Sequence, residues 1–150
     1  MLLVENRKAR FDYEFLESYL AGMVLSGPEV KSLRHKHGSL TGSYVKILNN
    51  EAFLLNAQIS PYPSADNRTY DPTRTRKLLL RKHELQNLQE KAAQKGLSLI
   101  PEKFELLGRN IKLRFSLARG KKQHQQRSAL RERDIRRQLD KESKFNLKHQ

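Results

Sequence analysis

The sequence predicts a mainly β fold with peripheral helices (α+β), in which a small OB-like barrel is followed by a basic C-terminal tail. The first observation is that apolar and polar side chains alternate along residues 111–117 and 44–59. A period of two is typical of a strand with one buried and one solvated face. Helical patterns at about 28–37 and 77–95 provide the second. Short strands with inserted helices favour a closed or partly closed barrel, and such barrels commonly bind nucleic acids.

Residues 11–25 carry an aromatic pattern that fits two structures. Phe11, Phe15, Tyr19 and Met23 recur every four residues, as they would on one face of a helix. The aromatic content favours a strand instead. The pattern alone leaves both interpretations open.

A short helix is predicted after Ser26. Pro28 suits the first helical position, where its missing N–H costs nothing, and Glu29 lies near the positive end of the helix dipole. Gly38 is expected to end the helix in a left-handed conformation. The predicted helix covers about residues 28–37.

A hairpin follows, with Val45 and Ile47 on one face of its first strand. Asn49-Asn50 supplies two residues that tolerate the positive φ angles of a tight turn. In the second strand, one face is expected to carry Phe53, Leu55, Ala57 and Ile59.

Residues 61–76 are rich in turn formers and are predicted to form a loop. Arg68, Arg74 and Arg76 make this loop basic, and loops on rigid barrels often carry function. Residues 77–95 are predicted to form the main helix, ended by Gly96. Its apolar side would consist of Leu78, Leu79, Leu80, Leu85, Leu88 and Ala92.

Two strands are predicted to complete the body. The first covers residues 97–107, where Pro101 implies an edge strand or a bulge. Gly108-Arg109-Asn110 turns the chain into residues 111–117, whose wet face carries Lys112 and Arg114.

The charge excess extends over the whole chain. The 150 residues contain 30 Lys+Arg and 16 Asp+Glu, a net charge of +14, of which residues 120–150 contribute +6 and the remainder +8. Such an excess is typical of nucleic-acid binding. We expect one folded domain over residues 1–119. The tail, residues 120–150, is poor in apolar side chains and is expected to be disordered when free, becoming partly helical against a polyanion.

Several classes of function are not expected. The chain has no Cys, no bilayer-length apolar run and no glycine loop that would cradle phosphates. His35 and His37 would point to different faces of a helix, so no metal site is predicted. We therefore predict no enzyme, no cofactor and a cytoplasmic protein. Among RNA-binding functions, the alternative to a protein dedicated to one RNA is a general OB-type RNA-binding protein. A membrane-surface binder is disfavoured, because the apolar face of the tail is weak.

Four segments in this order point to one family. They are Asn6-Arg7-Lys8-Ala9, Gly27-Pro28-Glu29-Val30-Lys31-Ser32-Leu33-Arg34, Asp71-Pro72-Thr73-Arg74-Thr75-Arg76-Lys77-Leu78-Leu79-Leu80 and Ala118-Arg119-Gly120-Lys121-Lys122-Gln123-His124. Together they closely resemble the SsrA-binding protein family, also called small protein B, over about residues 6–127.

The resemblance implies an OB-type barrel and a strand for residues 11–25. It also implies a non-enzymatic protein that binds transfer-messenger RNA and delivers it to stalled bacterial ribosomes in trans-translation. The barrel would bind the tRNA-like domain of that RNA. The tail would enter the decoding centre and mRNA channel of the 70S ribosome. Elongation factor Tu would be a partner only through the RNA, and the protein would be a monomer without membrane contact.

The resemblance also implies two groups of site residues. The RNA-binding group on the body consists of Asn6, Arg7, Lys8, Leu79, Lys112 and Arg114. The decoding-centre group consists of Arg119, Lys121, Lys122, His124 and Arg127. Residue type favours core packing rather than RNA contact for Leu79.

The chain departs from the family pattern at three places. Leu20 stands where a glutamate is usual and cannot accept a hydrogen bond from RNA. Arg81 stands where Asn or His is common and could add a phosphate contact. Gln125-Gln126 replaces the usual Asp-Lys and leaves the net charge unchanged.

Overall fold

The computed structural model describes residues 1–121 and 136–137. Residues 1–120 form one compact unit. In chain order its elements are β1 (Leu2–Glu5), α1 (Arg7–Asp12), β2 (Tyr13–Met23), α2 (Gly27–Arg34), β3 (Gly38–Ser39), β4 (Tyr44–Leu48), β5 (Glu51–Leu55), β6 (Gln58–Ile59), β7 (Arg76–Leu79), α3 (Lys82–Ala92), β8 (Leu97–Leu107) and β9 (Asn110–Gly120).

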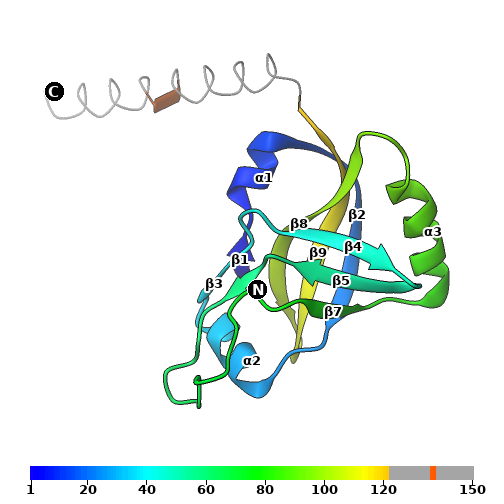
Figure 1. The fold of residues 1–150 in the computed structure, drawn as a ribbon. Helices are drawn as coiled ribbons and strands as arrows, with labels where there is room; N and C mark the ends of the chain where they lie inside the picture. The colour runs from blue at the N-terminus through cyan, green and yellow to red at the C-terminus, as the bar shows by residue number, and fades with distance from the viewer. Residues whose placement is uncertain (122–135, 138–150) are drawn as a thin grey trace, which may run out of the picture. The chain divides into compact units, whose positions relative to one another are not determined.

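The main sheet of this unit closes into a barrel (Figure 1). Its strands follow the order β8-β4-β5-β7-β2-β9, and β9 pairs again with β8, so that the sheet returns to its start. All of these pairings are antiparallel, and β1 pairs with β8 outside the closed ring. The helices α1, α2 and α3 lie outside the strands (Figure 1). The small barrel with peripheral helices that the sequence predicts is therefore confirmed.

The interior is filled by alternate residues of the strands. Phe115 and Leu113 of β9 are completely buried, and Ile111 and Leu117 are nearly so, as their alternation predicts. The strand extends beyond the predicted residue 117 to Gly120. Ala118 is also buried, because it packs with Ala9 and Ile100 in a second, smaller apolar cluster beneath α1.

The ambiguous aromatic segment is a strand, as the resemblance implies. β2 pairs with β9 from Tyr13 to Gly22, with a bulge between Phe15 and Glu17. The preceding residues form the short helix α1, which ends at Asp12. The recurrence of aromatic residues every four positions is therefore not helical from Tyr13 onward.

The predicted start of α2 is confirmed, but its predicted end is wrong. Ser26 and Glu29 form a reciprocal capping box, with hydrogen bonds of 3.0 and 3.3 Å. The helix ends at Arg34, and Lys36 rather than Gly38 takes the positive φ, at 64°. Gly38 belongs to β3, where a Cβ atom would lie 2.9 Å from the carbonyl oxygen of Gln58.

The predicted hairpin is confirmed as β4 and β5, with φ angles of 52° and 61° at Asn49 and Asn50. The prediction of which side chains share a face of the second strand is wrong at the start of that strand. Its buried residues are Ala52 and Leu54, followed by Ala57 and Ile59. The phase changes at Asn56, which has a φ of 61° and separates β5 from β6.

The predicted helix over residues 77–95 is wrong in its first part. Arg76–Leu79 forms β7, because Leu78 is buried while Lys77 and Leu79 are exposed, which is a strand period. Only Lys82–Ala92 is helical, and Leu88 packs into the core. Pro101 causes a shift in register between β8 and β9 before Lys103, as its predicted bulge requires.

Candidate nucleic-acid interface

Three neighbouring strands present one surface around Gly22. Gly22 of β2 lies opposite Leu79 of β7 and opposite Lys112 of β9. A Cβ atom on Gly22 would lie 3.4 Å from Cβ of Leu79 and 3.5 Å from Nζ of Lys112. Because Gly22 has no side chain, the side chains of Leu79 and Lys112 can approach each other across it. We call this surface the Gly22 face and define it as Leu20, Gly22, Lys77, Leu79, Arg81 and Lys112, which all line one hollow.

Two leucines form the apolar part of the Gly22 face. The exposed fraction is 53% for Leu79 and 36% for Leu20. The expectation that Leu79 packs in the core is wrong, because β7 alternates and Leu78 takes the inward position at 2% exposure. A large exposed apolar side chain beside cations can pack on a ribose or a base while the cations contact phosphates.

The cations of the Gly22 face differ in their surroundings. Lys77 contacts Glu51, with 3.3 Å between Nζ and Oε1. Lys112 and Arg81 form no ion pair with any acidic side chain within residues 1–121. These two positive charges are therefore not compensated by the body.

Arg114 lies on β9 next to the Gly22 face, opposite Leu20. Its Nε donates a hydrogen bond of 2.8 Å to Oε1 of Glu105, which also contacts Lys103 at 3.2 Å. The hydrogen bond from Arg114 lowers the pKa of Glu105, against the opposing effect of burial. The Arg114 guanidinium is therefore already paired with the Glu105 carboxylate, whereas Lys112 has no such partner in residues 1–121.

The N-terminal site residues differ in how far their side chains are buried. Asn6 is only 3% exposed and caps α1, since its Oδ1 accepts a hydrogen bond from the backbone N–H of Ala9. Its Nδ2 donates to the carbonyl oxygens of Leu40 and Pro101. Arg7 and Lys8 are exposed, and the Arg7 side chain is 90% accessible. In this structure Asn6 ties three parts of the chain together, whereas Arg7 and Lys8 face solvent.

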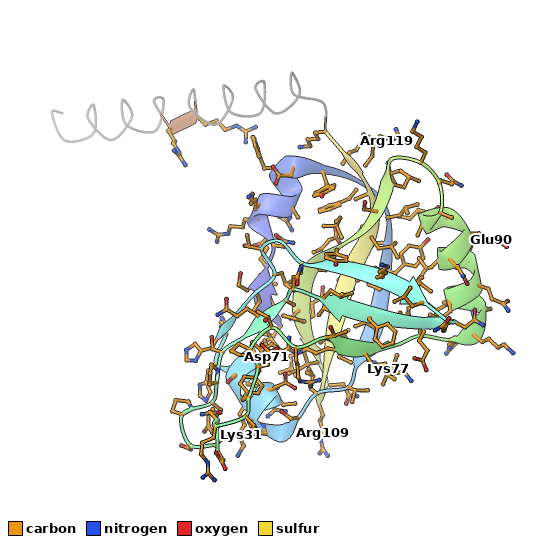
Figure 2. The ribbon with its side chains drawn as sticks, in the orientation of Figure 1. Lys31, Asp71, Lys77, Glu90, Arg109 and Arg119 are labelled. Carbon is orange, nitrogen blue, oxygen red and sulfur yellow. The ribbon has the colours of Figure 1, made fainter. Side chains whose placement is uncertain are left out.

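The decoding-centre group begins at the far end of β9. Arg119 is exposed (Figure 2). It pairs in register with Glu14 of β2. It is seven residues from Lys112 along one strand, a separation of roughly 23 Å. Lys121 is the last residue that the structure describes in this part of the chain. Lys122, His124, Arg127, the Gln125-Gln126 departure and the predicted disorder of the tail lie outside the described residues.

The basic loop predicted at residues 61–76 is largely neutralised. Arg68 is paired with Asp66, and Arg74 is paired with Glu29. Arg76 is completely buried, and its Nε donates to Glu29 at 2.8 Å. Its Nη1 and Nη2 donate to the carbonyl oxygens of Ala57, Arg74 and Pro72 and to the Tyr70 hydroxyl. Sequence reasoning did not predict the pair of Arg76 with Glu29. The alternation of Arg76 with Leu78 was the available signal that both side chains face inward.

Sequence reasoning also missed Gly22 and Lys77 as parts of the candidate interface. Neither residue is unusual in its local sequence, and only the pairing of β2 with both β7 and β9 brings them beside Leu79 and Lys112. Along the part of the chain that the structure describes, no helix is long and apolar enough to cross a membrane.

Comparison with known proteins identifies the family. The family model described as "SmpB protein" matches residues 3–145. The chain is 42% identical to the SsrA-binding protein of Persephonella marina, over 98% of this chain and 97% of that protein. It is 45% identical to the SsrA-binding protein of Thermosynechococcus vestitus, over 95% of each. The SsrA-binding protein of Chlamydia muridarum is 46% identical over 91% of each.

A solved structure is also similar to this chain. It is described as "tmRNA-SmpB: a journey to the center of the bacterial ribosome", and its matching chain is 49% identical. The two align with a TM-score of 0.68, over 79% of this chain and 84% of the other. The similarity covers both the sequence and the barrel. This chain belongs to the SmpB protein family.

Proposed function

We propose that this protein binds transfer-messenger RNA and delivers it to stalled bacterial ribosomes for trans-translation. The observation that carries the proposal is the Gly22 face, where exposed Leu79 lies beside the uncompensated cation of Lys112. The relatives are called SsrA-binding proteins, and the description of the similar structure names tmRNA, SmpB and the bacterial ribosome. The barrel, residues 1–119, binds the tRNA-like domain of the RNA.

Each body residue has a proposed role. Lys112, Arg7 and Lys8 neutralise phosphates, because they are cations at the surface of the body. Leu79 packs against a ribose or base. Arg114 contacts RNA while its guanidinium remains oriented by Glu105. Asn6 acts as a positioning residue, since its buried side chain holds the start of α1 and thereby the backbone that carries Arg7 and Lys8.

Arg81 extends the same surface in this chain. It precedes α3, and its backbone N–H donates to Glu84 while its side chain is exposed. We propose that Arg81 contributes a phosphate contact that offsets the missing acceptor at Leu20. Leu20 itself enlarges the apolar area beside Leu79.

The tail, residues 120–150, is proposed to act on the ribosome. Arg119, Lys121, Lys122, His124 and Arg127 contact the decoding centre of the small subunit, and the residues beyond them enter the mRNA channel. The end of β9 at Gly120 supports a boundary at that point. The protein acts in the cytoplasm as a monomer without catalytic activity, and elongation factor Tu is reached only through the RNA.

A competition gel shift tests the proposal. The full chain is titrated against the tRNA-like domain of transfer-messenger RNA, with ordinary tRNA as the competitor. We expect a complex that resists a large excess of tRNA. A complex that yields equally to any RNA would show that the barrel does not select its partner, and a general OB-type RNA-binding protein would then describe the chain better.

A further inference from the structure

A cluster of aromatic rings lies beside a lysine at the C-terminal end of α2. The rings of His35 and His37 are 6.1 Å apart between centroids and inclined by 30°. The ring of Tyr62 lies 6.3 Å from that of His35 and is inclined by only 14°. Nζ of Lys31 lies 5.5 Å from the Tyr62 ring centroid. We call Lys31, His35, His37 and Tyr62 the ring cluster.

The backbone at the end of α2 brings the two histidines together. The N–H of His37 donates to Ser32 at 3.0 Å, and that of Lys36 donates to Leu33 at 2.9 Å. These bonds form a Schellman motif, in which Lys36 takes the left-handed position with a φ of 64°. The reversal at Lys36 stacks His35 and His37, although a continuous helix would point them apart.

The segment that carries Tyr62 is fixed at both ends. Next to Tyr62, the N–H of Ser60 donates to the carbonyl of His37 at 3.1 Å, and the Ser32 hydroxyl donates to the carbonyl of Ser60 at 2.7 Å. At the far end, Arg76 is bound to the buried Glu29. Tyr62 is therefore held beside His35 by hydrogen bonds on either side.

Positive charge surrounds the ring cluster without compensation. Lys31, Arg34 and Lys36 are all exposed, and none has an acidic partner in the described residues 1–121. Glu29, the acidic residue of α2, is buried and occupied by Arg74 and Arg76. None of the large exposed apolar side chains comes from α2 or residues 60–75. This combination fits a polyanion with flat bases better than a membrane or an apolar protein surface.

The ring cluster is distinct from the sites already described. None of its four residues lines the hollow on the Gly22 face. Lys31 also lies at the opposite end of the barrel from Arg119 (Figure 2). An RNA contact here would be additional to both.

We propose that the ring cluster is a second RNA-binding site, which takes an unpaired base. The base stacks on the exposed ring of His35 and the half-buried ring of Tyr62. The neighbouring phosphates are neutralised by Lys31, Arg34 and Lys36. The identification of the ligand as RNA rests on the proposed function. Base stacking tolerates any sequence because every base has a flat face, so this site selects unpaired RNA over duplex.

Cross-link mapping with the full chain and intact transfer-messenger RNA tests the proposal. Ultraviolet irradiation of the complex, followed by nuclease digestion and mass spectrometry of peptides, locates contacted residues even though other cations also bind RNA. We expect cross-linked peptides from residues 31–37 or 60–76, together with peptides that contain Leu79 or Lys112. In Tyr62→Leu, the first set should disappear and the second should remain.

Affinity for a ten-nucleotide unstructured RNA provides an independent measurement. Replacing one stacking ring, as in Tyr62→Leu or His35→Ala, should weaken binding on the order of tenfold, and Tyr62→Phe should restore it. Tyr44→Leu, which removes an exposed tyrosine outside the ring cluster, is the matched control and should not change binding. An RNA duplex should be insensitive to all four variants.

The two proposals fail in different ways. Cross-links to the Gly22 face without any from the ring cluster, or equal oligonucleotide affinity in Tyr62→Leu and wild type, would overturn the second site alone. Absence of competitor-resistant binding to transfer-messenger RNA would overturn the proposed function, whatever the ring cluster does with the oligonucleotide.

Discussion

Glu29 and Arg76 form an ion pair in which both side chains are completely buried, with 2.7 Å between Oε2 and Nη2. Glu29 also caps its own helix and accepts hydrogen bonds from Arg74 and from the Tyr70 hydroxyl. The pair therefore joins α2, β7 and the segment between β6 and β7. Because the ring cluster is built on α2 and on that segment, the ion pair also supports the proposed second RNA site.

Replacing Arg76 by methionine should strongly destabilise the barrel. The change leaves the Glu29 carboxylate buried with fewer partners, and breaking a buried pair typically costs about 3–5 kcal/mol. Urea unfolding of both proteins measures the difference. Arg68→Met, which removes an exposed partner of Asp66, is the matched control and should leave the urea midpoint unchanged. Equal midpoints for wild type and Arg76→Met would contradict the importance of the pair.

Acid should remove the stabilisation that Glu29 provides. Burial raises the pKa of Glu29, but hydrogen bonds from Arg74, Ser26 and Arg76 outweigh it and hold the pKa at about 2, against 4.5 for a free glutamate. Because the folded-state pKa is lowered, the stabilisation is complete above pH 4.5 and is lost as the pH falls towards 2. It corresponds to about 3 kcal/mol.

The measurement is urea unfolding of wild type and Glu29→Gln between neutral and acidic pH. We expect the stability difference between the two proteins to be largest near neutral pH and to shrink below pH 4.5. A difference that stays constant down to pH 3 would mean that Glu29 does not titrate in this way.

Lys36→Gly should stabilise the protein by about 1 kcal/mol, because a side chain in the left-handed region is strained and glycine is not. Thermal unfolding measures the change. Lys36→Ala removes the same charge but keeps the Cβ atom, so it should show no such gain. If both variants had the same stability, the left-handed backbone of Lys36 would not be the cause of the change.

Asn6→Ala and Arg7→Ala should separate positioning from contact. Asn6→Ala removes a helix cap and leaves buried carbonyl groups without donors, so it should cost about 2 kcal/mol of unfolding free energy. Arg7→Ala should leave stability unchanged, because its side chain is 90% accessible, and should weaken RNA binding. Unfolding curves and gel shifts on both variants measure these effects. A stable Asn6→Ala with weakened RNA binding would instead make Asn6 a contact residue.

Lys112→Ala should weaken binding to the tRNA-like domain and reduce its salt dependence. Losing one phosphate contact should lower the slope of log affinity against log salt by about one. Titrations at several salt concentrations measure the slope. Lys95→Ala removes an exposed lysine outside the Gly22 face and serves as the control for net charge. An unchanged slope in Lys112→Ala would remove Lys112 from the interface.

Features encoded within a few residues could be predicted from the sequence. The turn at Asn49-Asn50, the capping box at Ser26 and the alternation around Phe115 each depend on local chemistry. The strand β7 was missed because three consecutive leucines satisfy a helical pattern and a strand pattern equally well. Only its pairing with β2 and β5 decides between them.

The candidate site was predictable in part for the same reason. Lys112 follows from the alternation of its own strand, so its outward position could be predicted. The exposure of Leu79 could not, because its residue type favours burial and the strand that turns it outward was not recognised. The stacking of His35 on Tyr62 depends on a left-handed lysine and on a segment 28 residues away that binds α2, which no local pattern reveals.

Because Tyr13 pairs with Gly120 across β2 and β9, the ring of strands joins the beginning of the body to its end. During synthesis, β2 therefore leaves the ribosome without its longest partner, which is the last strand of the barrel to be translated. Antiparallel folds with such distant pairings fold in milliseconds to seconds. The N-terminal half must wait with an unpaired strand edge until β9 has been made, so the barrel cannot close on a chain whose translation stops before that strand.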